Sequence, residues 1–239
     1  MAVFILGAGL QRIAGLGIGL VVAPILTLML GPATGVTLSN VGAVMTTLLV
    51  LGALRRDVDW PEFRRLAPLI VTGSILGAFA VRELSAGWLE TLIGASILIA
   101  LLLTVAADGH VHVRGRGVAL AAGSVGGFMN ATAGVAGPAL TIYAVATRWE
   151  QRSFAATLQP ILLTANLTAL VGKGLVGSVP LTELLVWPVW AAVASAVLVG
   201  VIAGSYLERW VNNRRARQAA IVIAALGGLV TLARGLTAI

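Results

Sequence analysis

The chain has 239 residues, of which 59% are hydrophobic and only 10% are charged, whereas a soluble domain usually carries about 25% charged residues. This composition excludes an ordinary soluble protein and predicts an all-α polytopic membrane protein in contact with membrane lipid. The net charge is +7, but no basic cluster is interleaved with aromatic residues, so we expect no nucleic-acid partner. Cys is absent, which excludes disulfides and thiolate sites, and we expect no metal and no cofactor.

Eight apolar blocks follow one another along the chain, separated by charged or turn-rich stretches. One helical crossing needs about 20 apolar residues. The blocks lie at about 1–31, 34–54, 66–81, 86–107, 118–147, 153–176, 181–207 and 218–236. The first and the fifth are unusual, because each has about 30 residues and a glycine-rich interruption near its centre.

The interruptions are the stretches "AGLGIG" (14–19) and "AGVAGP" (133–138), and their glycines are Gly15, Gly17, Gly19, Gly134 and Gly137. Glycine tolerates sharp turns and lets two half-helices pack backbone against backbone. We therefore expect each of these blocks to turn back near mid-membrane. The N-terminus of a half-helix then presents free N–H groups and a positive dipole end, which favour an anion.

A shift of 119 residues aligns the two halves of the chain. It places Gly7 on Gly126 and Gly15 on Gly134, and the order of the blocks also matches. We interpret residues 1–117 and 118–239 as two repeats of one transmembrane domain. Each repeat contains one broken helix and three full crossings.

The distribution of Lys and Arg supports this topology. If all eight blocks cross, seven basic loop residues lie on one face and eight on the other, which is no bias. If the broken blocks return to the face they came from, twelve lie on one face and three on the other. The twelve are Arg55, Arg56, Arg64, Arg65, Arg114, Arg116, Arg148, Arg152, Arg209, Arg214, Arg215 and Arg217. The positive-inside rule favours the second arrangement, in which the repeats are inverted, the basic loops are cytoplasmic and both termini are periplasmic.

Polar residues inside the blocks are the candidates for ligand contact. Gln11 and Asn130 occupy equivalent positions under the 119-residue shift, as do Asn40 and Gln159. Their amides would hydrogen-bond sulfonyl oxygens, or would link helices, as membrane Asn and Gln commonly do. Thr132 is a weaker candidate, because Ser and Thr inside helices usually bond their own turn.

Charged residues inside the blocks are few. Arg12 precedes the first interruption by three residues, and a mid-membrane Arg costs at least ~2.5–3.5 kcal/mol. The Arg12 guanidinium neutralises a bound anion in one interpretation. In the other, it extends to the membrane interface or pairs with a carbonyl. Lys173 lies near a loop, and Glu90 begins the fourth block, which favours an interfacial position. No acid falls clearly at mid-membrane, so proton coupling through a buried carboxylate is not supported.

At the two interruptions the sequence resembles the sulfite exporter TauE/SafE family, also called the toluene sulfonate uptake permease family. The stretches that carry the resemblance are "GLGIGLVVAPIL" (15–26) and "GFMNATAGVAGPALTIYAV" (127–145). Ile18 and Ala136 stand where that family often has glycine. The resemblance implies a bacterial inner-membrane carrier of small sulfur-containing anions, such as sulfite or organosulfonates.

The sequence thus favours a secondary transporter whose site lies at mid-membrane between the two broken helices. The alternative is a channel-type anion pore or an accessory membrane subunit. We do not expect an enzyme, because no "GxSG" or "HExxH" is present and both His residues lie in one loop. Glycine-rich faces would permit a homodimer without requiring one.

Overall fold

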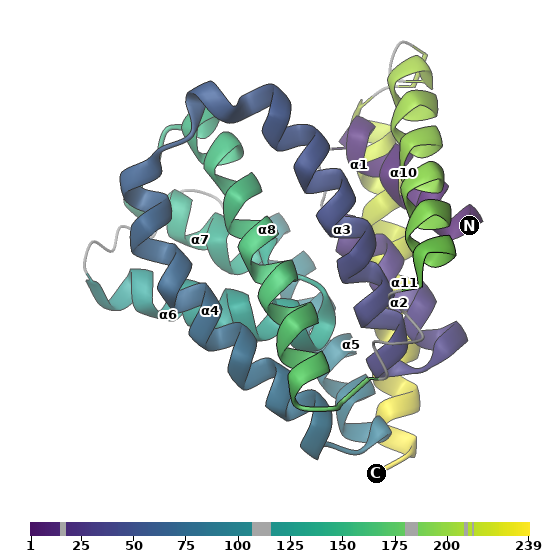
Figure 1. Ribbon diagram of the computed structural model, residues 1–239. Helices are drawn as coiled ribbons and strands as arrows, with labels where there is room; N and C mark the ends of the chain where they lie inside the picture. Colours follow the sequence, from purple (N-terminus) through teal and green to yellow (C-terminus); the bar gives the residue numbers. More distant parts are fainter. Residues whose placement is uncertain (15–17, 107–115, 180–185, 208–209, 212) are drawn as a thin grey trace.

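The computed structural model describes residues 1–14, 18–106, 116–179, 186–207, 210–211 and 213–239 (Figure 1). Within these residues every regular element is helical. The first half contains α1 (Ala2–Ala14), α2 (Ile18–Leu30), α3 (Pro32–Leu54), the short 3₁₀ helix η1 (Arg55–Asp57), α4 (Trp60–Glu83) and α5 (Ala86–Ala106). The second half contains α6 (Arg116–Ala133), α7 (Gly137–Thr147), α8 (Gln151–Leu175), α10 (Trp187–Leu207) and α11 (Asn213–Thr237).

Both long blocks are broken at the predicted places. The first block forms α1 and α2, with 13 residues each, and the fifth forms α6 with 18 and α7 with 11. At 1.5 Å per residue, α1, α2 and α7 are about 16–20 Å long, which is too short to cross a hydrocarbon core of about 30 Å. These three helices therefore need neighbours that cover their ends.

The other six blocks form long single helices of 21 to 25 residues. By length and composition, five of them could cross a membrane within the described residues: Pro32–Asp57, Trp60–Glu83, Gln151–Leu175, Trp187–Leu207 and Arg215–Thr237. Large apolar side chains such as Leu76, Leu102 and Leu226 are exposed on the outside of the bundle. Lipid accepts such a surface, whereas water would penalise it. The predicted all-α polytopic membrane architecture is confirmed.

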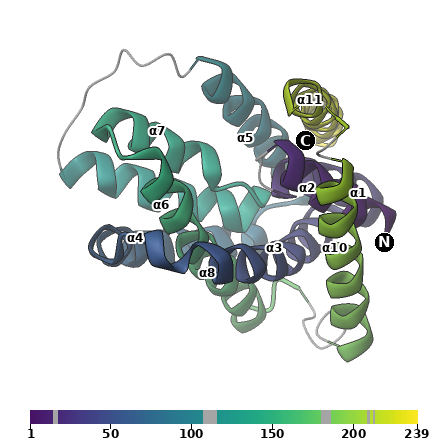
Figure 2. The same cartoon turned by 90° about the horizontal axis from the view of Figure 1, so that it is seen from above.

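Helices of one half pack mainly against helices of the other. Helix α4 packs on α6 and α10 packs on α1, while α5 pairs with α11 and α3 pairs with α8. Figures 1 and 2 both show α4 beside the helices of the second half and α10 beside α1 and α2. Exchanging the two halves converts the α4–α6 pair into the α10–α1 pair and maps the α5–α11 and α3–α8 pairs onto themselves. This pairing is what two repeats related by a two-fold axis would produce; their inverted orientation in a bilayer stays a prediction.

Small residues allow the helices to approach closely. Gly73 and Gly77 on α4, and Gly123 and Gly127 on α6, each form a Gly-x-x-x-Gly pair. A Cβ added to Gly73 would lie 2.0 Å from the Ser124 carbonyl oxygen. A Cβ on Gly127 would lie 2.2 Å from the Ile70 carbonyl oxygen. In a membrane, where apolar surface gains nothing by leaving lipid, such backbone contact is a main source of helix association.

Cysteine labelling tests the predicted return of α6 and α7 to one face. The chain has no native Cys, so single variants Gly117→Cys and Gln151→Cys report only the two ends of this hairpin. We expect a membrane-impermeant maleimide to label both from the cytoplasmic face, and Ser85→Cys, between α4 and α5, from the opposite face. Labelling of positions 117 and 151 from opposite faces would show instead that this block crosses the membrane.

Candidate functional site

The two half-helices of each broken block turn back along each other. A Cβ on Gly7 of α1 would lie 2.3 Å from Val22 Cγ2 and 3.2 Å from Ile18 Cγ1 on α2. In the second block, a Cβ on Gly126 of α6 would lie 3.7 Å from the Cβ of Ala139 on α7. Each pair therefore forms a helical hairpin, and the tip of the hairpin is the glycine-rich interruption.

The two hairpin tips touch each other. A Cβ on Gly19, at the start of α2, would lie only 1.9 Å from the carbonyl oxygen of Gly134, at the end of α6. Gly134 has φ 73°, a left-handed conformation that glycine adopts without strain. Its own Cβ would meet Ala23 at 3.2 Å. Glycine is thus required at both positions, once for close approach and once for backbone conformation.

The N-termini of α2 and α7 differ in how their free N–H groups are used. Gln11 Oε1 accepts a hydrogen bond from Ile18 N at 3.1 Å, so this side chain caps α2. Helix α7 begins at Gly137 with Pro138 in its first turn, where the missing N–H costs nothing. The N-cap residue Ala136 supplies no side-chain hydrogen bond to this end, and a Cβ on Gly137 would meet no atom of the described residues within 4 Å. The open N-terminus is therefore the one on α7.

Ser39 and Asn40 on α3 lie beside the touching tips. Each side chain is 1% exposed, and Asn40 Oδ1 and Ser39 Oγ are each 3.6 Å from the position of a Cβ on Gly134. Within the described part of the chain, Ser39 Oγ and both polar atoms of the Asn40 amide lack a hydrogen-bond partner. Leaving such a group unpaired costs about 1–3 kcal/mol. Unpaired polar groups in a native fold need an explanation, and a bound ligand is one.

The remaining amide and hydroxyl candidates bond mainly within the protein. Asn130 Nδ2 donates to Asn166 Oδ1 at 3.0 Å, which links α6 to α8, and the Asn130 carbonyl accepts from Gly134 N at 2.9 Å. Thr132 Oγ1 donates to the Phe128 carbonyl at 2.9 Å, on its own helix. Gln159 Nε2 donates to its own helix at 3.2 Å, while its Oε1 is buried without a partner among the described residues.

Three predicted residues fall wholly or partly outside the described residues. Gly15 and Gly17 lie in the segment 15–17, and Arg12 lies in the last turn of α1, but its side chain is not described. The described residues of the candidate site are therefore Gly19, Gly134 and Gly137 on the hairpin tips and Ser39 and Asn40 on α3. All of these residues except Ser39 were predicted from the sequence as site residues. For Ser39, the sequence offers only its position next to Asn40.

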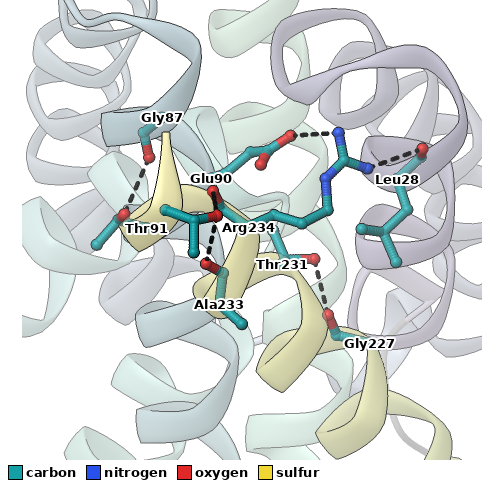
Figure 3. Close-up of polar contacts among 9 residues, drawn as sticks. Leu28, Gly87, Glu90, Thr91, Gly227, Thr231, Ala233 and Arg234 are labelled. Carbon is teal, nitrogen blue, oxygen red and sulfur yellow. Dashed lines mark hydrogen bonds and ion pairs between the residues drawn. The ribbon is translucent and has the colours of Figure 1, made fainter. Parts of the chain in front are cut away.

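Glu90 and Arg234 form an ion pair that also holds α2 (Figure 3). Arg234 Nη2 lies 3.3 Å from Glu90 Oε1, and Arg234 Nη1 donates to the Leu28 carbonyl at 3.3 Å. Glu90, for which the sequence favoured an interfacial position, is buried in the bundle, and its partner Arg234 is half-exposed. One guanidinium thus joins α5 and α11 to a free carbonyl in the last turn of α2, where a positive charge also favours the helix dipole.

Lys173, which the sequence placed near a loop, differs from expectation in its burial. Its side chain is 0% exposed, and Nζ donates to Thr37 Oγ1 at 3.3 Å. The position of Lys173 in its block did not indicate this burial, because a lysine three residues from the end of an apolar block usually extends its amine to water.

An apolar hollow elsewhere does not fit an anion. It has a volume of about 580 Å³ and is lined by Met45 of α3 and by residues of α10, namely Trp187, Trp190, Ala191 and Ala194. None of the predicted site residues contributes to it.

Comparison with known proteins gives one match. The family model described as "Sulfite exporter TauE/SafE" matches residues 1–231. Neither a curated protein nor a solved structure matches the chain.

The Glu90–Arg234 ion pair predicts a measurable effect on stability. Arg234→Met leaves the buried Glu90 carboxylate without its cation, so we expect the free energy of unfolding in detergent to fall by about 1–3 kcal/mol. Adding Glu90→Gln should restore most of this loss, because a neutral amide is far cheaper to bury. Thermal unfolding of the two variants checks this, and equal stability of Arg234→Met and the unmodified protein would contradict it.

Proposed function

The chain belongs to the sulfite exporter TauE/SafE family, and we propose that it is a secondary transporter of small sulfur oxyanions, sulfite or organosulfonates, across the bacterial inner membrane. The family is one of membrane exporters, and the apolar helical bundle fits a transport role. We place the basic loops in the cytoplasm and both termini in the periplasm, because this topology alone gives the strong charge bias. Two-fold pairing of the halves supports a carrier built from inverted repeats.

The contact between the two hairpin tips is the observation that carries the proposal. A broken helix in a membrane is tolerated only where its free backbone groups are buried in protein or line a wet cavity. Here the Gly134 carbonyl meets Gly19, and the unpartnered Asn40 amide and Ser39 hydroxyl stand beside them. An Asn amide and a Ser hydroxyl are donors for oxyanion oxygens.

The residues are assigned the following roles. The free N–H groups of α7 at Gly137 and the Asn40 amide bind the anion, and Arg12 supplies positive charge from the last turn of α1. Gly19 and Gly134 allow the tips to approach closely, and Gly15 and Gly17, which lie outside the described residues, remain predicted site residues. Gln11 and Asn130 support the site by joining neighbouring helices, whereas Thr132 and Gln159 bond within their own helices.

A carrier fits this arrangement better than the alternative of a channel-type pore. The close approach of Gly19 to the Gly134 carbonyl favours entry of the anion from one face at a time. Such a site supports alternating access by movement of one half against the other. The two mechanisms differ in kinetics, because a carrier saturates and exchanges labelled for unlabelled substrate, whereas a pore does neither.

Substitution of Gly19 tests the role of the tips. In proteoliposomes loaded with unlabelled sulfite, the unmodified protein should take up ³⁵S-sulfite by saturable counterflow. Gly19→Ala places a methyl group against the Gly134 carbonyl, an overpacking of about 1–3 kcal/mol, so we expect flux to fall about tenfold.

Gly52→Ala is the matched control, because the same methyl group enters open space on the exposed side of α3. It should transport normally. Flux that is insensitive to Gly19→Ala would show that the tips are not the site. Absence of saturation and counterflow in the unmodified protein would favour a pore.

Replacement of Asn40 separates ligand binding from stability. Asn40→Leu removes two polar atoms that have no partner within the described residues. We therefore expect thermal stability to be unchanged or raised, while the KM for sulfite rises about tenfold from the loss of a charge-assisted hydrogen bond. A variant with normal KM and lower stability would assign Asn40 a structural role.

A further inference from the structure

Lys173 is a cation buried inside the bundle. It lies two residues before the end of α8 and is fully buried. Its amine donates to Thr37 Oγ1 at 3.3 Å, while the Thr37 hydroxyl donates to the Ala33 carbonyl at 2.6 Å. Among the described residues, no carboxylate forms an ion pair with Lys173. An ammonium group has three donors, so most of its hydrogen-bonding capacity is unused in this part of the chain.

Burial of such a group has a large energetic cost. An ammonium ion taken from water into an apolar interior loses its hydration, and one neutral hydroxyl does not replace it. A lysine close to a helix end normally avoids this cost by extending to the interface. Intramembrane cations that stay buried are in most cases partnered or functional. A buried amine either stays neutral or takes a negative partner, and a transported anion would be such a partner.

Buried polar side chains lie along α3 and α8, the helices that carry Lys173 and the residues beside the hairpin tips. Thr37 and Asn40 are three residues apart on α3 and therefore share a face, and Asn40 stands beside Gly134. On α8, Asn166 lies two turns before Lys173 on the same face and bonds Asn130, whose carbonyl accepts from Gly134 N. We call Lys173, Thr37, Asn40 and Asn166 the polar file; all four side chains are at most 2% exposed.

We propose that Lys173 binds the sulfur oxyanion at the end of the polar file. The inference rests on the proposed function and adds to it a second cationic residue, on the opposite half of the chain from Arg12. The ammonium donates to an anion oxygen while Thr37 holds the amine in place. Opposite charges attract strongly at low dielectric, so the Lys173 ammonium offsets the charge of the anion while the anion lies in the membrane interior.

The competing explanation is that Lys173 only supports the structure. In that case it ties α8 to α3 through Thr37, or its charge is balanced by Glu183, which lies outside the described residues. A structural lysine affects folding but not the dependence of flux on substrate concentration. The two explanations therefore differ in what a neutral substitution does to KM.

The experiment compares Lys173→Met and Lys173→Arg with Leu170→Met. Leu170 lies one turn away on α8 and is buried in an apolar cluster, so it receives the same new side chain without a change of charge. ³⁵S-sulfite counterflow in proteoliposomes gives KM, and calorimetry with sodium sulfite on the detergent-purified protein gives the dissociation constant. We expect Lys173→Met to raise both constants at least tenfold, Lys173→Arg to retain much of the affinity, and Leu170→Met to behave as the unmodified protein.

The outcomes separate the inference from the proposed function. If the unmodified protein transports sulfite and Lys173→Met has normal constants, the inference fails and the transport function stands. If the unmodified protein binds sulfite through Lys173 but does not transport it, the transport function fails and the inference stands. Lack of sulfite binding by the unmodified protein overturns both.

A further variant tests the ion-pair explanation. If Lys173 serves only to balance Glu183, Glu183→Gln should impair flux as Lys173→Met does, and the double variant should restore it. Restoration would overturn the inference. We expect instead that the double variant keeps the raised KM of Lys173→Met.

Discussion

The need to satisfy backbone polar groups at a helix break inside a membrane governs this structure. In hydrocarbon, an unpaired N–H or C=O costs several kcal/mol, so α1, α2 and α7 cannot end where they do unless protein covers their ends. The fold meets this need by placing the two breaks against each other, with Gly19 on the Gly134 carbonyl and Gln11 on Ile18 N. The remaining helices enclose this contact, and the buried polar side chains gather around it.

Patterns that act over one helix were predictable from the sequence. The long apolar blocks, their ends and the glycine-rich breaks depend on local composition, and the structure places helices and breaks where these patterns indicate. The sequence placed the two breaks opposite each other around one site, but the individual contacts between distant segments were not predictable. Nothing in the sequence pairs Gly19 with the Gly134 carbonyl or Lys173 with Thr37, 136 positions away along the chain. The oxygen of Gln11 caps α2, a contact that the sequence did not indicate, while contact of Gln11 with substrate stays a prediction.

The contacts between helices and the candidate site involve different residues in this bundle. The glycine pairs of α4 and α6 and the Glu90–Arg234 pair lie where helices touch. Within the described residues the Asn40 and Ser39 side chains have no hydrogen-bond partner, and the Lys173 amine donates to Thr37 Oγ1. In the carrier that we propose, a transported anion would supply the missing partners.

The packing of helices of one half against helices of the other affects the order in which contacts form during synthesis. The hairpin of α1 and α2 is synthesised first, but its packing partner α10 begins only at Trp187. At about 5–20 residues per second, the ribosome needs roughly 10–40 seconds to cover that interval. During this time the glycine-containing surface of α1 that later packs against α10 lacks that partner. Biogenesis of this protein therefore includes the late insertion of α10, followed by α11, beside the oldest segment of the nascent chain.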